Sequence, residues 1–148
     1  MTNGQAFSPK RFTWPVRVYW EDTDAGGIVF YANYLRYFER ARTEWLRALG
    51  LEQHALRLQT GGMFVVSEAN LKYLRPARLD DQLLVTAELV EMGRSSFTMT
   101  QEALLISQQS PQAPTTRLCV AGVRIGWVDG NTLKPARIPP FVLEALQP

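Results

Sequence analysis

The sequence predicts an α+β protein in which one long helix is wrapped by a curved antiparallel sheet of about five strands. A single long helical pattern lies near the N-terminus, over residues 33–50, and four long runs rich in β-branched and aromatic residues follow it. Consecutive antiparallel strands of this length can form a curved sheet, and an apolar helix can fill its concave face.

Composition bounds the organisation of the chain. With 148 residues, 46% of them hydrophobic and 20% charged, we expect a flexible N-terminal arm at 1–14 and a single globular domain at 15–148. The net charge of +2, without a run of Lys or Arg, argues against a nucleic-acid partner. The single cysteine, Cys119, fits a reducing compartment. We find no signal-like segment and no run of 18 apolar residues, so we expect a cytoplasmic protein without a transmembrane segment.

The first two elements are a strand and the long helix. The alternation in "VRVYW" (16–20) predicts the first strand. In "NYLRYFERARTEWLRALG" the apolar residues recur every three or four positions, which predicts a buried helix face made by Leu35, Phe38, Ala41, Trp45 and Leu49. Asn33 is the expected N-cap, and Gly50 stands where a glycine ends a helix.

The rest of the chain is expected to be mainly β structure. A looser segment ends at "TGGM", and strands are then predicted at 64–74, 82–92, 95–107 and 116–128. The short Gly93-Arg94 break predicts a tight hairpin, and a short helix is expected after Pro140. Such a sheet leaves an edge strand to be covered. Continuation of the sheet into a second copy would cover it, which predicts a homo-oligomer.

The segment "WEDTDAGGIVFYANY" (20–34) is the main candidate for chemistry. One interpretation is an acidic loop whose Asp22 and Asp24 stabilise the start of the next helix. The other uses Gly26 and Gly27, which let a ligand atom approach the backbone closely, beside the free N–H donors of a helix start. A carboxylate near such donors can attack a carbonyl or activate water. The pattern is therefore compatible with acyl transfer.

The same segment resembles a known family. "EDTDAGGIVFYANYLRYFERARTEWL", with "VSEANLKYLRPARLDDQLLV" and "MGRSSFTMTQ", is similar to the 4-hydroxybenzoyl-CoA thioesterase branch of the hotdog-fold superfamily. It resembles in particular the acyl-CoA thioesterases encoded beside the bacterial Tol-Pal system. The resemblance implies a hotdog fold, in which a sheet wraps a helix, assembly into dimers or tetramers, and hydrolysis of an acyl-CoA in lipid metabolism.

The resemblance also implies roles for single residues. The catalytic aspartate falls on Asp24, as nucleophile or general base, and the main-chain N–H that polarises the thioester carbonyl falls on Tyr31. Gly26 and Gly27 would shape the turn that admits the thioester, and Asp22 is the better candidate for a turn acid. Many Tol-Pal-associated relatives carry His at the position of Tyr31, so a role for an imidazole is not carried over, whereas the backbone contact is.

Coenzyme A also needs a phosphate site. The turn "GRSS" matches a turn that is rich in Arg and Lys in the hydroxybenzoyl-CoA enzymes, which gives Arg94, Ser95 and Ser96 as phosphate contacts. The alternative for Arg94 is a solvated hairpin arginine. Arg75 and Arg78 are weaker candidates, because the neighbouring acids could pair with them.

Three functions remain open from the sequence. The favoured one is an acyl-CoA thioesterase that needs no cofactor and no metal. A hotdog hydratase would normally pair a catalytic histidine with a carboxylate, and the sole histidine, His54, lies outside the motif. A non-catalytic module that binds acyl carrier protein or envelope-biogenesis proteins is the third. The sequence has neither a zinc-ligand pattern nor a G-x-S-x-G element.

Overall fold

The computed structural model describes residues 11–107 and 116–147. The N-terminal arm up to residue 10 and residues 108–115, between two of the predicted strands, lie outside the described residues. In chain order the elements are β1 (Arg11–Arg17), the 3-10 helix η1 (Trp20–Asp22), α1 (Asn33–Ala48), α2 (Gln53–Thr60), β2 (Gly62–Tyr73), β3 (Gln82–Met92), β4 (Ser96–Leu105), β5 (Thr116–Asp129) and α3 (Pro140–Leu146).

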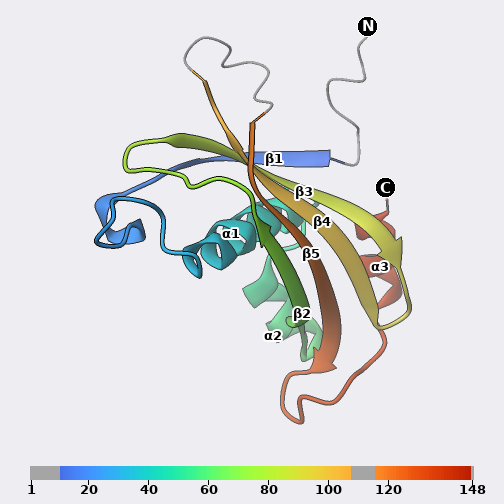
Figure 1. Ribbon diagram of the computed structural model, residues 1–148. Helices are drawn as coiled ribbons and strands as arrows, with labels where there is room; N and C mark the ends of the chain where they lie inside the picture. Colours follow the sequence, from blue (N-terminus) through green and yellow to red (C-terminus); the bar gives the residue numbers. More distant parts are fainter. Residues whose placement is uncertain (1–10, 108–115, 148) are drawn as a thin grey trace, which may run out of the picture.

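The five strands form one sheet in the order β1-β3-β4-β5-β2, and every neighbouring pair is antiparallel. Figure 1 shows the long strands curving past α1. β2 lies at one edge of the sheet and β1 at the other. Gly126 of β5 stands opposite both Val65 of β2 and Ser96 of β4, so the start of β2 and the start of β4 lie at the same end of the sheet.

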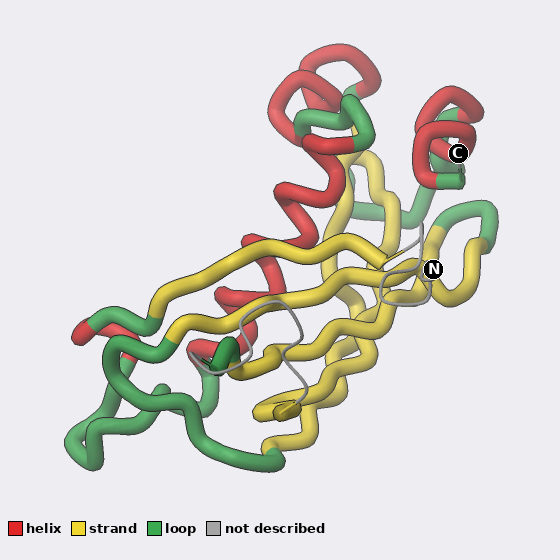
Figure 2. The backbone as a smooth tube through the Cα atoms, turned by 90° about the horizontal axis from the view of Figure 1, so that it is seen from above, coloured by secondary structure: helices red, strands yellow, loops and turns green. Residues whose placement is uncertain are grey.

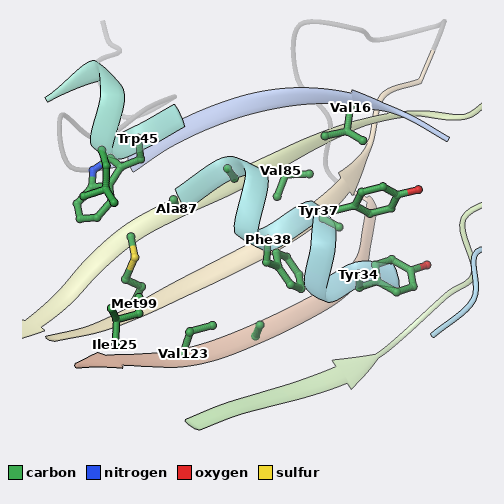
Figure 3. Packing of buried hydrophobic residues seen from close by; sticks show 14 of the residues in the cluster. Val16, Tyr34, Tyr37, Phe38, Trp45, Val85, Ala87, Met99, Val123 and Ile125 are labelled. Atoms are coloured by element: carbon green, nitrogen blue, oxygen red, sulfur yellow. The ribbon is translucent and has the colours of Figure 1, made fainter. Parts of the chain in front are cut away.

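Helix α1 fills the concave face, as the sequence predicted. Its buried side chains pack against strand residues such as Val85, Met99 and Val123 (Figure 3). The buried residues of α1 are Asn33, Tyr34, Tyr37, Phe38, Ala41, Trp45 and Leu46. Leu35, expected on this face, is 46% exposed. Tyr34 and Tyr37 are buried on this face of the helix instead of Leu35, because a tyrosine can bury its ring while its hydroxyl extends to the edge of the core.

The start of α1 differs from the expected cap. Ala32 holds the N-cap position, without a side-chain cap bond, and Asn33 is the first helical residue. The Asn33 side chain donates instead to Asp22 Oδ1, over 2.9 Å. A side chain committed to another segment cannot also cap its own helix, so the N-cap prediction was wrong. At the other end Gly50 has φ +84°, as expected of a glycine that ends a helix.

The segment expected to be loose contains a further helix, α2. The Glu52 carboxylate accepts the N–H groups of His54 and Ala55, over 3.1 and 3.0 Å, and so caps the start of the helix. Gly61, with φ +77°, ends it. Glutamate is not among the residues that usually mark an N-cap, which is why the sequence pattern gave no helix here.

The first strand starts and ends earlier than expected. β1 covers residues 11–17 rather than 16–20, so residues 11–14 belong to the sheet and not to an arm. The chain leaves the sheet at Val18, whose N–H donates to Asp81 O over 2.9 Å. The predicted strands at 64–74, 82–92, 95–107 and 116–128, the hairpin and the terminal helix are confirmed within two residues of their bounds.

Loops gather at two opposite ends of the sheet (Figures 1 and 2). At one end, the loop before α1 meets the loop between β2 and β3, because Val29 N–H donates to Ala77 O over 2.9 Å. At the other end, the hairpin between β3 and β4 lies beside the segment before α3, since Ile138 N–H donates to Arg94 O. β3 joins the two ends and spans about 30 Å. None of the described helices is long and apolar enough to cross a bilayer.

Candidate active site

Asp24 lies in a tight loop that two glycines make possible. Thr23 and Val29 form an antiparallel bridge, and within it Asp24 N–H donates to Ile28 O over 2.9 Å. Gly27 N–H donates to Asp24 O, with φ +78° at Gly27, a conformation that favours glycine. The loop therefore fixes the backbone of Asp24 on both sides.

The carboxylate of Asp24 is exposed but oriented. Its Oδ1 accepts the N–H of Gly26 over 2.9 Å, and no other hydrogen bond to the carboxylate comes from the described residues. A Cβ at Gly26 would lie 3.3 Å from this same oxygen, a crowded contact. The second glycine of the motif thus sets the backbone turn, and the first leaves room for the acid. The outcome is a carboxylate with one oxygen held and the other open to a ligand.

Asp22, two residues earlier, is a structural acid. Only 5% of its surface is exposed. Its Oδ2 accepts the N–H of Tyr19 over 2.8 Å, its Oδ1 accepts the Asn33 side chain, and its backbone oxygen accepts the N–H of Phe30 over 2.9 Å. Asp22 therefore ties the motif loop to the first turn of α1, which matches the turn role that the sequence favoured for it.

A buried hydroxyl lies beside Asp22. Burial, and then the Asp22 carboxylate, raise the pKa of Tyr37. No partner within the described residues has hydrogen-bonding geometry to the Tyr37 hydroxyl, so its interaction with the Asp22 carboxylate is electrostatic. The acid faces a neutral phenol, which makes the Asp22 environment unlike that of Asp24.

Tyr31 presents a free backbone donor just before α1. No acceptor within the described residues takes its N–H, while its carbonyl accepts the hydroxyl of Tyr73 over 3.1 Å. The Tyr31 side chain is 63% exposed, and its ring lies against those of Phe30 and Tyr73, with centroids 4.6 and 6.3 Å away. The aromatic contacts hold the peptide in place, and the N–H remains available to a ligand oxygen.

A hollow of about 280 Å³ opens beside Tyr31. It is lined by Ile28, Val29, Tyr31, Tyr34, Tyr73, Leu74, Arg75 and Pro76. The floor is mostly apolar, and Tyr34 is fixed there because its hydroxyl accepts the N–H of Ala77 over 3.1 Å. Asp24 does not line the hollow itself, but its backbone partner Ile28 does. The arrangement could hold a thioester carbonyl at the Tyr31 N–H, with Asp24 in the adjoining loop.

Sequence reasoning named neither Tyr34 nor Tyr73 and ranked Arg75 low. Tyr34 stands one turn after Tyr31, a spacing that brings two residues to the same side of a helix start. Tyr73 is the last residue of β2, next to the loop that packs on the motif. Arg75 lines the Tyr31 hollow, whereas Arg78 does not. Arg75 is therefore the better placed of the two to bind an anionic ligand at this end of the sheet.

The predicted phosphate contacts lie elsewhere. Arg94 is exposed in the hairpin between β3 and β4, where Gly93 N–H donates to Ser96 O over 2.7 Å. Ser95 O accepts the N–H of Trp127. Ser96 Oγ accepts a guanidinium N–H of Arg124 over 3.2 Å, which adds a second cation that the sequence did not suggest. This hairpin is at the far end of β3, so one chain does not bring Arg94, Ser95 and Ser96 together with Asp24, Tyr31 and the glycines.

Comparisons with known proteins agree with this fold. The profile of the family described as the thioesterase-like superfamily matches residues 18–146. The acyl-CoA thioester hydrolase YbgC of a strain of Escherichia coli is 41% identical over 132 residues, which cover 89% of this chain and 92% of that protein. The acyl-CoA thioesterase YbgC of Haemophilus influenzae is 40% identical over 134 residues, covering 90% and 93%.

Solved structures give the same result. A probable thioesterase from Bartonella henselae superposes with a TM-score of 0.77 at 30% identity, covering 87% of this chain and 99% of that one. The 4-hydroxybenzoyl-CoA thioesterase of a Pseudomonas strain gives a TM-score of 0.81 at 22% identity, covering 92% and 99%, and at that identity it supports the hotdog fold alone. The chain therefore belongs to the thioesterase-like superfamily and is a thioester hydrolase built on the hotdog fold.

Proposed function

We propose that the protein hydrolyses acyl-CoA thioesters, with Asp24 as the catalytic carboxylate and the backbone N–H of Tyr31 as the donor that polarises the carbonyl. The observation that carries the proposal is the pairing of an open carboxylate with an unused donor on one short segment. Asp24 is held by Gly26 N–H, and Tyr31 N–H has no acceptor within the described residues. The YbgC relatives are named for acyl-CoA hydrolysis, which supports the same substrate class.

Two alternative routes of hydrolysis are compatible with Asp24 as the catalytic carboxylate. In the first, an Asp24 oxygen bonds to the acyl carbon, the carbon–sulfur bond breaks, and the thiolate of CoA leaves. Water then cleaves the resulting anhydride. In the second, Asp24 takes a proton from water as the water attacks, and the thiolate leaves in the same way. In both, negative charge builds on the carbonyl oxygen, where a preorganised N–H stabilises the transition state by about 3 kcal/mol.

A homodimer would unite the two separated parts of the site. β2 is an edge strand with exposed apolar side chains, Val66 at 49% and Tyr73 at 47%. If two copies pair antiparallel through β2, the start of one β2 lies beside the end of the other. The hairpin with Arg94 lies at the start of β2, and the Tyr31 hollow lies at its end. The phosphate contacts of one copy would then serve the catalytic segment of its partner.

The proposed substrate also indicates the cellular compartment of the protein. Acyl-CoA is an intracellular metabolite, so we propose a cytoplasmic enzyme of lipid metabolism, and the single buried Cys119 fits a reducing compartment. The homodimer is the smallest assembly that completes the site. The outer face of the sheet stays open in that dimer and allows two dimers to form a tetramer.

The test is thiol release from a panel of short aliphatic, long-chain and aromatic acyl-CoAs. Asp24→Asn should lower kcat about a hundredfold or more and leave the circular dichroism spectrum unchanged, because one carboxylate carries the general-base or nucleophilic step. Asp22→Asn should lower kcat less. The chain's own thiol will not add background, since burial raises the pKa of Cys119 to about 12 and keeps it protonated at the assay pH.

Three outcomes would count against the proposal. Equal rates for the wild type and Asp24→Asn would remove Asp24 from the mechanism. Formation of an enoyl product without free thiol would indicate a hydratase. Absence of thiol release with every acyl-CoA, together with binding of an acyl carrier protein, would favour a non-catalytic binding module.

A further inference from the structure

A groove runs between α1 and the edge strand β2, starting one helical turn from Tyr31. Among the α1 residues that line it, four follow Tyr31 at helical spacing: Leu35, Glu39, Arg42 and Leu46. Two adjoining hollows make up the groove, of about 580 and 200 Å³, and they share Glu39, Arg42 and Val66. The hollow at Tyr31 shares no lining residue with these two, and Leu35, four residues after Tyr31, marks the near end of the groove.

Apolar side chains supply part of the walls of the groove. Phe38, Val66, Ala69 and Val123 line the larger hollow beside Leu35. Val66 and Leu35 are about half exposed, at 49% and 46%, although both are apolar. A groove with apolar side chains that starts one helical turn from Tyr31 suits an acyl chain, because each buried methylene contributes about 0.8 kcal/mol.

Arg42 is a charged residue that lines both hollows of the groove. Its guanidinium is half-buried and donates to Gln101 Oε1 over 3.0 Å. Gln101 is fully buried and is itself fixed, since its amide donates to Phe38 O and Thr86 O, each over 3.1 Å. Burial lowers the pKa of Arg42. Within the described residues Arg42 forms no ion pair, and one hydrogen bond accounts for only one of its five N–H donors.

The charges around the larger hollow favour an anion. Three arginines, Arg36, Arg40 and Arg42, line it against one acid, Glu39. Glu39 raises the pKa of Arg42 from nearby without reaching it as an ion pair. A partly desolvated cation gains most from a carboxylate that it can bind with two N–H groups.

We infer that the groove receives the acyl chain and that Arg42 selects acyl groups that carry a carboxylate at their far end. The inference rests on the proposed acyl-CoA hydrolysis and names its substrate class, the CoA thioesters of dicarboxylic acids. Tyr31 and Arg42 are eleven residues apart, which places them about 16 Å apart along the helix axis. An extended chain covers about 1.2 Å per bond, so the preferred acyl group is roughly a dozen bonds long.

The experiment compares matched pairs of substrates on the full-length protein. Each pair has one acyl length, from short to long, with a terminal methyl or a terminal carboxylate, and thiol release gives kcat/KM for both. The wild type should prefer the carboxylate form by about tenfold near the length that reaches Arg42, because a charge-assisted hydrogen bond gives that much discrimination. Arg42→Met should bring the ratio to about one, because the carboxylate form loses its charge-assisted contact.

Two further variants separate selection from folding. Arg47→Met, on the solvent side of the same helix, should keep the wild-type preference. Arg42→Lys retains the charge and should keep part of the preference even if Arg42→Met does not fold. A role of Arg42 only in holding Gln101 would slow both members of each pair equally in Arg42→Lys, which would overturn the inference.

The substrate pairs also separate this inference from the proposed function. If the wild type releases thiol from methyl-terminated acyl-CoAs and shows no preference for carboxylates at any length, the inference is wrong and the proposed function stands. If it releases thiol from neither series, the proposed function itself fails.

Discussion

Asp22 and Asp24 show how two acids of one motif acquire different roles. Their side chains are identical, but the carboxylate of Asp22 is buried and accepts two donors, whereas that of Asp24 is exposed and accepts one. The distinction comes from the turn that follows Asp24. Gly26 leaves space near the Asp24 carboxylate, and Gly27 takes a left-handed backbone conformation, so the chain folds back on Asp24 and leaves its outer oxygen open.

The backbone conformation of Gly27 is open to a direct test at this scale. Gly27→Ala should destabilise the protein by about 1 kcal/mol, because an L-residue is strained at φ +78° even though a Cβ would meet no atom there. Gly122→Ala is the matched control: its added Cβ also meets nothing within 4 Å, and its φ is not positive. Urea unfolding measures both. A loss at Gly122 equal to that at Gly27 would mean that backbone strain is not the cause.

At the scale of elements, long patterns were predictable and short ones were not. The strand at 82–92 was predicted with its observed bounds because eleven residues give a clear β pattern. α2 has only eight residues and a glutamate cap, so local pattern could not distinguish it from a loop. The bounds of β1 are set by pairing with β3, a tertiary contact that its own sequence does not carry.

The cap of α2 gives a prediction for this element. Glu52→Ala should lower the free energy of unfolding by about 1 kcal/mol, since both cap bonds to His54 and Ala55 are lost. Glu52→Asp keeps a carboxylate that can accept the same N–H groups and should retain most of the stability. Thermal unfolding followed by circular dichroism gives both values. Equal losses in the two variants would show that the cap bonds do not stabilise α2.

For the whole molecule, the catalytic motif could be recognised in the sequence, but its distance from the predicted phosphate contact Arg94 could not. Asp24, Tyr31 and the glycines are neighbours in the chain, so one segment carries them. Arg94 is separated from them by β3, and only the sheet order reveals that it lies at the opposite end. Arg42 escaped prediction for a similar reason, because its partner Gln101 comes from a distant strand.

Mixing two variants tests the composite site. Asp24→Asn and Arg94→Ala copies should each have low activity at low acyl-CoA concentration. After co-refolding, half of the dimers are mixed and one of the two sites in each is intact, so about a quarter of the wild-type activity should return. The activity of separately refolded copies is the control. No recovery, with mixed dimers present by mass spectrometry, would mean that Arg94 does not serve its partner's site.

The unpaired edge of β2 has a consequence for enzyme abundance. If both parts of the site come together only when β2 is paired, turnover per chain depends on the fraction of chains that are in dimers. The specific activity then falls on dilution below the dissociation constant of the dimer. A cell could therefore silence this enzyme by lowering its concentration modestly, since the number of working sites would fall with the square of the chain concentration in that range.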